Sequence, residues 1–440
     1  MAARDPLSHD DYTVGWICAL PLEMAAAKLM LDATHPSLPR PPTDQNTYIL
    51  GNIGNHNIVI VCLPSGEYGN VSAATVAIQL LSSFQSIRFG LMVGIGGGVP
   101  SSNADIRLGD IVVSQPADTS GGVVQYDLGK ALGGGQFQRT GMLNRPPKVL
   151  LTALVTLQAH HFTEDSRVLE FISDAQAKTT SRTAAANFER PTKEDLLYQI
   201  DYDHGASDTC VNCDRSKLTP RPPRDHKEPV IHYGLIASAN QVVEDGTRRD
   251  QLARDLGVLC VEKEAAGLLN DFPCVVIRGI CDYADSHKDK KWQGYAAAVA
   301  AAYAKELVLV VPIDQVKTTP TARDMHVDLR LVSDLYESAT KKRNMNGDDS
   351  EGSTICSDIS ARKKPRLHFS GSSDPEESDS TDHDGNSISD ESNQENAFNI
   401  PEPPDASQGT ESYASVSERP TARDTTSEEG SSDWYESSPF

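Results

Sequence analysis

The chain alternates short apolar runs with helix-forming segments, and this rhythm limits the folds that it can adopt. Within residues 12–115, an extended apolar run is followed by a helical pattern and then by another apolar run, with few residues between them. Strands that alternate with helices in this way usually pair in parallel. Patterns of the same kind resume near residue 230 and end in an alanine-rich helix before Pro312. The sequence therefore predicts an α/β fold with a central, largely parallel sheet.

Changes in composition predict the domain boundaries. One α/β domain is expected at residues 10–315, with 117–230 partly loop or insertion because this stretch is glycine-rich, proline-rich and polar. From 320 to 440 Ser, Asp, Glu, Asn and Pro dominate, which is typical of a disordered tail. Residues 374–440 hold 18 acidic and 2 basic side chains, a net of −16 out of −22 for the chain. The acidic charge therefore describes the tail, and no nucleic-acid partner is expected, because phosphate binding needs a basic footprint.

Several other classes of protein are not expected. No run of about 18 apolar residues is present, so no membrane partner is predicted. The N-terminal MAARDPLSHDDY lacks the apolar core of a secretory signal. The 8 cysteines are scattered and mostly lie in apolar runs, which fits a reducing compartment. We expect a soluble cytoplasmic protein, with nuclear import through the basic clusters at 341–343 and 362–366 as the alternative.

Two candidate features lie at the ends of the first predicted strands. Glu23, in ALPLE, follows the first apolar run, where α/β sheets bind ligands; a carboxylate at a helix N-terminus is the alternative. Gly94 to Gly98, in VGIGGGVP, are expected to form a turn after a strand and to point backbone N–H groups at an anion or oxygen. A tight structural turn would also explain them. The run matches neither a dinucleotide fingerprint nor a Walker phosphate loop.

Two further segments place carboxylates near predicted strands. Glu262 and Glu264, in CVEKEAAG, would suit two sugar hydroxyls, or would simply begin a solvated helix. In VVIRGICDYADSHK an apolar strand contains Arg278 and delivers Asp282 to its carboxyl end. An Asp beside a buried strand end can act as a general acid, whereas a turn or N-cap role is the alternative.

The order of these motifs is more specific than any one of them. ALPLE, VGIGGGVP with RLGDIVVS, GLIASANQVV, VEKEAAG and IRGICDYADSHK together resemble the nucleoside phosphorylase/nucleosidase superfamily, which includes purine and uridine phosphorylase-like domains. They are most similar to its fungal branch, whose domains often precede immune-receptor-like modules. The resemblance covers about residues 12–312. It implies a three-layer fold of that family and cleavage of an N-glycosidic bond without a cofactor or a catalytic metal.

The resemblance also implies roles for individual residues. Asp282 would protonate the purine at N7, and Glu264 would hold the ribose 2′ and 3′ hydroxyls. Glu23 would activate water, with Arg278 helping to hold it, so that Asp282, Glu23 and Arg278 form the expected catalytic set. With the patterns above, the expected substrate-binding set is Glu264, Glu262, Val242, Val243, Gly94, Gly96, Gly97, Lys263 and Lys288.

The lack of an arginine after the first strand favours hydrolysis over phosphorolysis. Phosphorolytic members carry arginine in the first turn, and GWICALPLEMAAAK has none. Ile95 stands where small nucleosidases tend to have Ser, so any contact there must come from the backbone. Lys263 replaces the usual Met beside the sugar; it would bind a phosphate, point to solvent or mark a weakened enzyme. Relatives assemble as dimers to hexamers, so a homo-oligomer is expected.

Basic residues near the expected site bear on the substrate. Lys288, with Arg248 and Arg249, would suit a 5′-phosphate chain, although a solvated helix face explains them equally well. We expect a purine nucleosidase with ATP or ADP as first choice and adenosine-like nucleosides as second, serving defence. A phosphate-dependent phosphorylase is one alternative. A catalytically silent nucleotide-binding or scaffold module is another, and Lys263 favours it.

One group of residues lies outside this scheme. His204, Cys210 and Cys213, in YDHGASDTCVNCD, have spacing compatible with zinc, with His226 and His232 downstream. A single C-x2-C is half of a structural zinc site, so ordinary loop thiols are the alternative.

Overall fold

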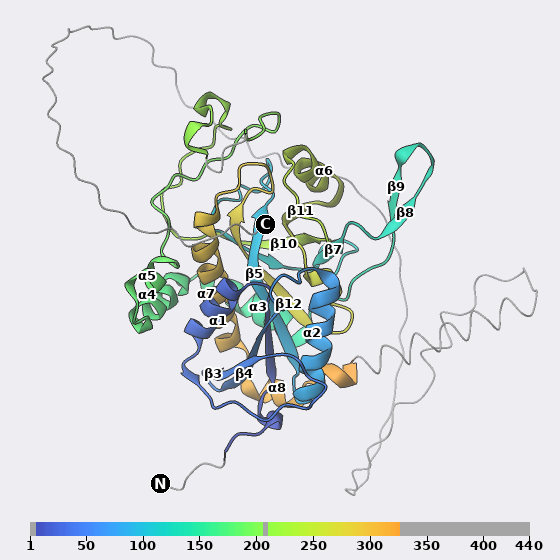
Figure 1. Ribbon diagram of the computed structural model, residues 1–440, viewed down its shortest axis with the longest axis vertical. Helices are drawn as coiled ribbons and strands as arrows, with labels where there is room; N and C mark the ends of the chain where they lie inside the picture. Colours follow the sequence, from blue (N-terminus) through green and yellow to red (C-terminus); the bar gives the residue numbers. More distant parts are fainter. Residues whose placement is uncertain (1–5, 206–209, 326–440) are drawn as a thin grey trace, which may run out of the picture. The chain divides into compact units, whose positions relative to one another are not determined.

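A ten-stranded sheet runs through the part of the chain that the computed structural model describes, residues 6–205 and 210–325 (Figure 1). The strand order is β11-β10-β6-β12-β5-β1-β4-β3-β2, and β7 pairs with β10. The pairs β12–β6, β11–β5, β3–β4 and β2–β3 are antiparallel, and the others are parallel. The predicted mixed, largely parallel sheet is confirmed. The bounds are β1 Val14–Cys18, β2 Ala33–Thr34, β3 Tyr48–Ile53, β4 His56–Cys62, β5 Phe89–Gly98, β6 Ile111–Ser114, β7 Val123–Gln125, β10 Ile231–Ser238, β11 Val258–Glu262 and β12 Cys274–Asp282.

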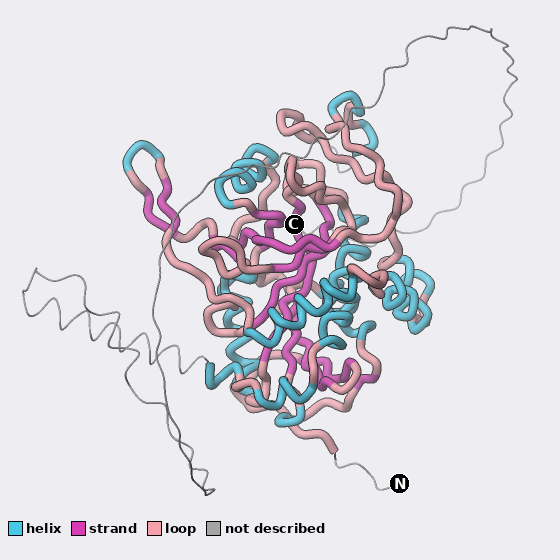
Figure 2. The backbone as a smooth tube through the Cα atoms, turned by 180° about the vertical axis from the view of Figure 1, so that it is seen from behind, coloured by secondary structure: helices cyan, strands magenta, loops and turns pink. Residues whose placement is uncertain are grey.

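Helices cover the sheet and complete the predicted three-layer α/β fold. Helix α1 packs against α7 together with α4, whereas α2 lies across the strands from α1 (Figure 1). Seen from behind, the strands form a continuous band with helices on both sides (Figure 2). The helices are α1 Pro21–Met30, α2 Asn70–Ser83, α3 Lys148–His161, α4 Val168–Lys178, α5 Arg182–Ala186, α6 Gly246–Leu256, α7 Gln293–Val310 and α8 Ile313–Thr318.

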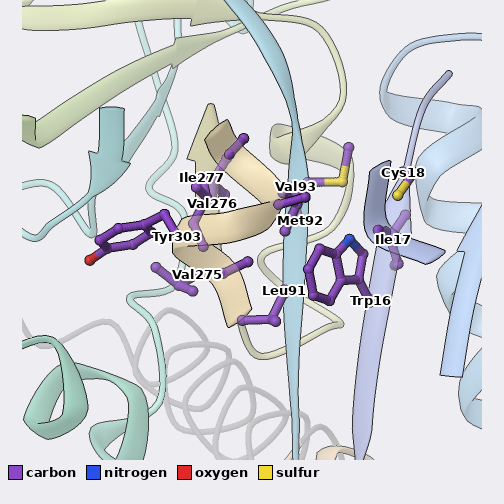
Figure 3. Close-up of a cluster of buried hydrophobic side chains, with 14 of the residues drawn as sticks. Trp16, Ile17, Cys18, Leu91, Met92, Val93, Val275, Val276, Ile277 and Tyr303 are labelled. Carbon is purple, nitrogen blue, oxygen red and sulfur yellow. The ribbon is translucent and has the colours of Figure 1, made fainter. Parts of the chain in front are cut away.

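The core lies along the neighbouring strands β1, β5 and β12. Trp16, Leu91 and Val276 are fully buried there, and Tyr303 of α7 lies against the same strands (Figure 3). Strands that are covered on both faces are apolar throughout, which is why each of these segments is a continuous apolar run in the sequence.

Helix α7 is the alanine-rich segment, and its small side chains allow close packing. At Gly279 a Cβ atom would lie 1.9 Å from the carbonyl oxygen of Ala296, so α7 and β12 approach almost backbone to backbone. The one buried lysine of α7, Lys305, donates hydrogen bonds to Asp32 at 2.6 Å and to the carbonyl of Met30 at 2.9 Å. Among the described residues, no helix combines the length and apolar character that crossing a bilayer requires.

The sheet closes on itself at one end, which the sequence did not predict. Strand β11 pairs with β10 and also runs antiparallel to β5, with Val261 opposite Gly97. Because β5, β12, β6, β10 and β11 each pair with the next, these five strands form a ring. The end of β11 is thereby brought to the ends of β5 and β12, where the candidate site lies.

The 117–230 region contains more regular structure than expected. Helix α3 lies where the sequence indicated a helix, but α4, α5 and the hairpin of β8 Gly129–Ala131 and β9 Phe137–Arg139 were not predicted. The hairpin extends away from the sheet in Figure 1. Most of the described residues of 187–205 and 210–230 lie outside helices and strands.

The ordered chain continues past residue 315, the expected end of the domain. Helix α8 spans this position, and beyond it the Ala322 N–H donates to the carbonyl of Ile87 at 2.8 Å. The predicted acidic tail lies outside the described residues from 326 onward, as do both basic clusters.

Candidate active site at the ends of β5, β11 and β12

Glu23 is held where β1 passes into α1. Its Oε2 accepts hydrogen bonds from the backbone N–H groups of Ala19 at 2.7 Å and Leu20 at 2.9 Å, which caps a helix whose N-cap, Leu20, has no polar side chain. Its Oε1 accepts from the N–H of Ile95 on β5 at 2.8 Å. Burial raises the pKa of Glu23, although Arg278 and these three N–H groups oppose the shift. Glu23 therefore caps the helix, which is the alternative interpretation, and its other oxygen reaches β5 at the candidate site.

Gly94 makes room for the two groups that meet beside it. A Cβ atom at this position would lie 2.4 Å from Glu23 Oε1 and 2.6 Å from Arg278 Nη1. Distances this short exclude any side chain unless the charged groups move. The neighbouring Ile95 contributes through its backbone, as expected, because its carbonyl accepts from Arg278 Nη1 at 3.3 Å.

Arg278 is the central cation of the site and is 1% exposed. Its Nη2 donates to the carboxylates of Glu262 and, at 3.4 Å, of Glu264. Burial disfavours the charged guanidinium, but Glu262, Glu264 and Glu23 outweigh that effect and raise the pKa of Arg278. The cation therefore stays charged and links β12 to the end of β11.

Glu262 differs from its predicted role. Besides Arg278, its carboxylate accepts the backbone N–H groups of Glu264 at 3.1 Å and Ala265 at 3.0 Å, and its side chain is 1% exposed. The protein itself uses these oxygens, so Glu262 positions Arg278 and the following turn instead of facing a substrate.

Glu264 has acceptor capacity that Glu262 lacks. Within the described residues, the 3.4 Å contact with Arg278 is the hydrogen bond that its carboxylate makes. Burial is the main cause that raises the pKa of Glu264 to about 7, and the charges of Glu262 and Glu23 add to it while Arg278 opposes it. Such a carboxylate suits a pair of hydroxyl donors.

Asp282 ends β12 at an irregularity in the strand. Ile280 lies opposite Gly96 and Asp282 opposite Gly97, so Cys281 is an extra residue in the ladder. Bulges of this kind redirect side chains at the end of a strand. Asp282 Oδ1 accepts the N–H of Ala284 at 2.8 Å, which stabilises a turn in which Ala284 has a positive φ of 51°.

The glycine run does not form the expected turn. Strand β5 continues through Gly98 because β12 pairs with it on one side and β11 on the other. The glycines are needed for close approach instead: a Cβ at Gly96 would lie 2.5 Å from Cys260 Sγ, and one at Gly97 would lie 2.9 Å from Asp282 Oδ1.

Comparison with known proteins agrees with this arrangement of motifs. The family model described as the phosphorylase superfamily matches residues 13–311. This chain belongs to the phosphorylase superfamily. The family predicted from the motifs is therefore confirmed.

Two of the relatives are much longer than the part of them that this chain matches. It is 48% identical over 309 residues to a nucleotide-binding leucine-rich repeat (NLR)-like protein of Hyaloscypha variabilis, covering 70% of this chain and 30% of that protein. It is 24% identical over 295 residues to the ATP nucleosidase Cap17 of Escherichia coli, covering 65% of this chain and 48% of the relative. The chain thus spans less than half the length of these relatives.

Smaller relatives are matched over nearly their whole length. The 5′-methylthioadenosine/S-adenosylhomocysteine nucleosidase of Mycobacterium bovis is 24% identical over 311 residues, covering 68% of this chain and 97% of that protein. Among solved structures, futalosine hydrolase of Helicobacter pylori is 16% identical with a TM-score of 0.44, covering 68% of this chain and 99% of that chain.

Lys263 occupies the position at which the resemblance implied a methionine. Its Nζ lies 5.7 Å from the ring centroid of Tyr68, in the loop that leads into α2. A cation over an aromatic ring in this range is attracted to the ring face. The charge is therefore directed to the 63–69 loop, between Glu264 and the start of α2.

The start of α2 is a part of the site that the sequence analysis missed. The Asn70 N–H donates to Asn240 Oδ1 at 3.0 Å, which ties α2 to the loop that carries Val242 and Val243. Gly69 precedes the helix with φ of 96°. A Gly-Asn pair between an apolar run and a helical pattern is the signal that could have indicated a special turn here.

The remaining predicted positions divide into exposed and buried groups. Val242 is 42% exposed and Val243 is buried. Lys288 lies 3.4 Å from Glu244 of the same loop, and the Arg248 guanidinium lies 5.5 Å from the ring centroid of Tyr126. Arg249 is not available to a phosphate, because it is buried and donates to Asp285 and to the carbonyl of Tyr283.

Proposed function

We propose that this chain is a purine nucleosidase that hydrolyses the N-glycosidic bond of adenine nucleotides, with ATP or ADP preferred, to free adenine and a ribose phosphate. The observation that carries the proposal is the cluster of Glu23, Glu262 and Glu264 around the single guanidinium of Arg278. The family membership and the nucleosidase relatives support it.

The charge of this cluster favours water over phosphate as the nucleophile. Three carboxylates surround one cation, and two of them, Glu262 and Glu264, already contact it. A phosphate dianion entering beside them would be repelled, whereas a neutral water would not. The same carboxylates stabilise the positive charge that develops on the sugar as the bond breaks.

Each step of the reaction has a group to perform it. The C1′–N9 bond breaks as Asp282 gives its proton to N7 of the purine, and the bonding electrons leave with the base. Glu23 Oε1 accepts the N–H of Ile95 and also holds a water. This water attacks C1′ and gives a proton to the Glu23 carboxylate. Glu264 holds the ribose hydroxyls so that C1′ lies between the two acids.

The preference for a nucleotide is supported by the placement of positive charge. Lys263 lies beside Glu264 in the sequence and extends over Tyr68. Lys288 pairs with Glu244, next to Val243, and Arg248 lies over Tyr126. These groups would meet a 5′-phosphate chain on a ribose held by Glu264. The relative named ATP nucleosidase supports this choice, and the 5′-methylthioadenosine nucleosidase supports the nucleoside alternative.

The test is chromatography of ATP, ADP, AMP and adenosine after incubation with the purified chain, in phosphate-free and phosphate-containing buffer. Free adenine without phosphate, lost in Asp282→Asn and retained in the exposed control Asp174→Asn, is the expected result. Adenine released only with phosphate would replace hydrolysis by phosphorolysis and remove Glu23 as water activator. If no adenine is released in either buffer, the chain is instead a catalytically silent nucleotide-binding or scaffold module. The expected homo-oligomer stays a prediction, to be measured by light scattering of the same preparation.

A further inference from the structure

Three side chains that can ligate a metal come together in the irregular 187–230 region. One ligand atom from each of His204, Cys210 and Cys213 lies within 4.8 Å of the other two. The Cys213 N–H donates to the carbonyl of Cys210 at 3.2 Å, which forms a tight turn across the C-x2-C sequence. Such a turn points two sulfurs in one direction, the arrangement that structural zinc sites use.

A fourth side chain beside this group, His287, has a ring nitrogen with no hydrogen-bond partner among the described residues. His287 lies on the turn after β12 with a side chain that is 3% exposed, and its Nε2 makes no hydrogen bond to any described residue. The His287 and His204 rings lie edge to face with centroids 5.3 Å apart. A buried ring nitrogen without a partner is uncommon in proteins and needs an explanation.

Neighbouring side chains hold the His287 ring in place. Its Nδ1 faces Asp285 at 4.0 Å, and its ring stacks on Tyr198 with centroids 4.1 Å apart. Metal-binding histidines typically place the second ring nitrogen toward a carboxylate, which fixes the ring and leaves the other nitrogen for the metal. Asp285 is in turn held by Arg249 at 3.3 Å.

We propose that His204, Cys210, Cys213 and His287 bind a zinc ion that fastens His204 and the Cys210–Cys213 turn to the turn following Asp282. Two thiolates and two imidazoles are a donor set that suits zinc and not magnesium or calcium. Zinc–sulfur bonds of about 2.3 Å require sulfurs about 3.8 Å apart, so the three clustered ligands need to close by only about 1 Å. A cavity of about 300 Å³ is lined by Cys210, His287 and Asp282, which places this site next to the end of β12.

The other histidines named from the sequence do not join this group. His232 Nε2 lies 3.0 Å from Asp110 Oδ2, and His226 lies 3.3 Å from Glu228. The zinc is structural in this proposal, because the expected chemistry needs no metal; it positions the turn that begins at Asp282.

The decisive measurement is the metal content of the purified full chain, expressed in zinc-supplemented medium and passed through a chelating resin. We expect about one zinc ion per chain, and a content below about one in ten chains would overturn the proposal. Replacement by Co²⁺ should give the visible absorption of a tetrahedral, thiolate-ligated ion. Absence of sulfur-to-cobalt charge transfer would overturn the assignment of Cys210 and Cys213.

Variants assign the ligands one by one. Cys210→Ser with Cys213→Ser should lose the zinc, whereas Cys356→Ser, in the tail, and His226→Ala should retain it. His287→Ala should weaken retention against a chelator at least tenfold; unchanged retention would remove His287 from the ligand set. If the double variant fails to fold, the zinc content of the unaltered chain and its Co²⁺ spectrum still decide the proposal, and neither depends on nucleosidase activity.

Discussion

Glu23 and Arg278 meet beside Gly94, in the space that a side chain there would fill. Glu23 Oε1 and Arg278 Nη1 lie 2.4 and 2.6 Å from the position of a Cβ atom on that glycine. One group comes from the start of α1 and the other from the middle of β12, and β5 lies between their strands. The missing side chain therefore allows charged groups from α1 and β12 to lie close together.

A Gly94→Ala substitution should displace Glu23 or Arg278 from its position. We expect a loss of about 1–3 kcal/mol in the free energy of unfolding, because a methyl group must displace buried charged groups, together with loss of adenine release. Denaturant titration and the chromatographic assay measure the two effects. Gly133→Ala is the matched control, since nothing lies within 4 Å of a Cβ at that position. Wild-type stability and activity in Gly94→Ala would contradict the described packing.

An Arg278→Met substitution should leave buried carboxylates without their cation. We expect the free energy of unfolding to fall by about 3–5 kcal/mol at neutral pH, which is the usual cost of removing one partner of a buried ion pair. The loss should shrink toward pH 5, since Glu264, whose pKa burial raises, can then take up a proton that the unfolded chain binds less tightly. Arg167→Met is the control, because that arginine pairs with Glu170 at 52% exposure and should matter by less than about 1 kcal/mol. Equal losses in both variants would argue against a central role for Arg278.

Stability and activity should respond to pH in opposite directions through Glu264. Its pKa of about 7 lies above the usual value of 4.5, so between these values the folded chain holds a proton that the unfolded chain has released. The free energy of unfolding should therefore fall as pH rises through this window, and Glu264→Gln should remove that slope. The kcat/KM for a nucleotide should instead rise through about pH 7, as the carboxylate that accepts the ribose hydroxyls forms. A pH slope of stability that persists in Glu264→Gln would assign it to another group.

The Lys263→Met substitution separates phosphate binding from packing. If Lys263 holds a phosphate chain, KM for ATP should rise about tenfold, which corresponds to about 1.4 kcal/mol, while KM for adenosine stays unchanged. Steady-state kinetics with both substrates measure the difference, and Lys130→Met on the exposed β8 strand is the charge-matched control. Equal changes for both substrates would show that Lys263 contacts the nucleoside or its loop and not the phosphates.

Local patterns were enough to predict the elements that carry the site. The apolar runs at β1, β5 and β12 are buried on both faces, and the position of Glu23 after β1 and of Asp282 at the end of β12 follows directly from the chain order. Helix α7 was predictable for the same reason, because its alanines and its packing are local in the sequence. Helices α4 and α5 were not predicted, since their segment has a polar composition; α4 is stabilised by contact with α7 and α1, which are distant in the sequence.

The glycine run shows where local interpretation was wrong. Glycines after an apolar run favour a turn, but Gly96 and Gly97 continue β5 because β12 and β11 supply hydrogen-bond partners on both sides. Those partners come from segments far along the chain, so no window around residue 96 contains the information.

The sequence by itself determined the α/β class, the order of the motifs and the membership in a family, because these depend on side chains a few positions apart. Only the tertiary structure decided what Glu262 and Glu264 do. Glu262 ends β11 and Glu264 follows it, but the antiparallel pairing of β11 with β5 closes the ring of strands and turns Glu262 onto Arg278 and the backbone of the following turn. Glu264, two residues further, keeps acceptor capacity and a raised pKa. The difference arises because burial and charge at each carboxylate are set by groups on α1, β11 and β12, which meet only when the sheet closes.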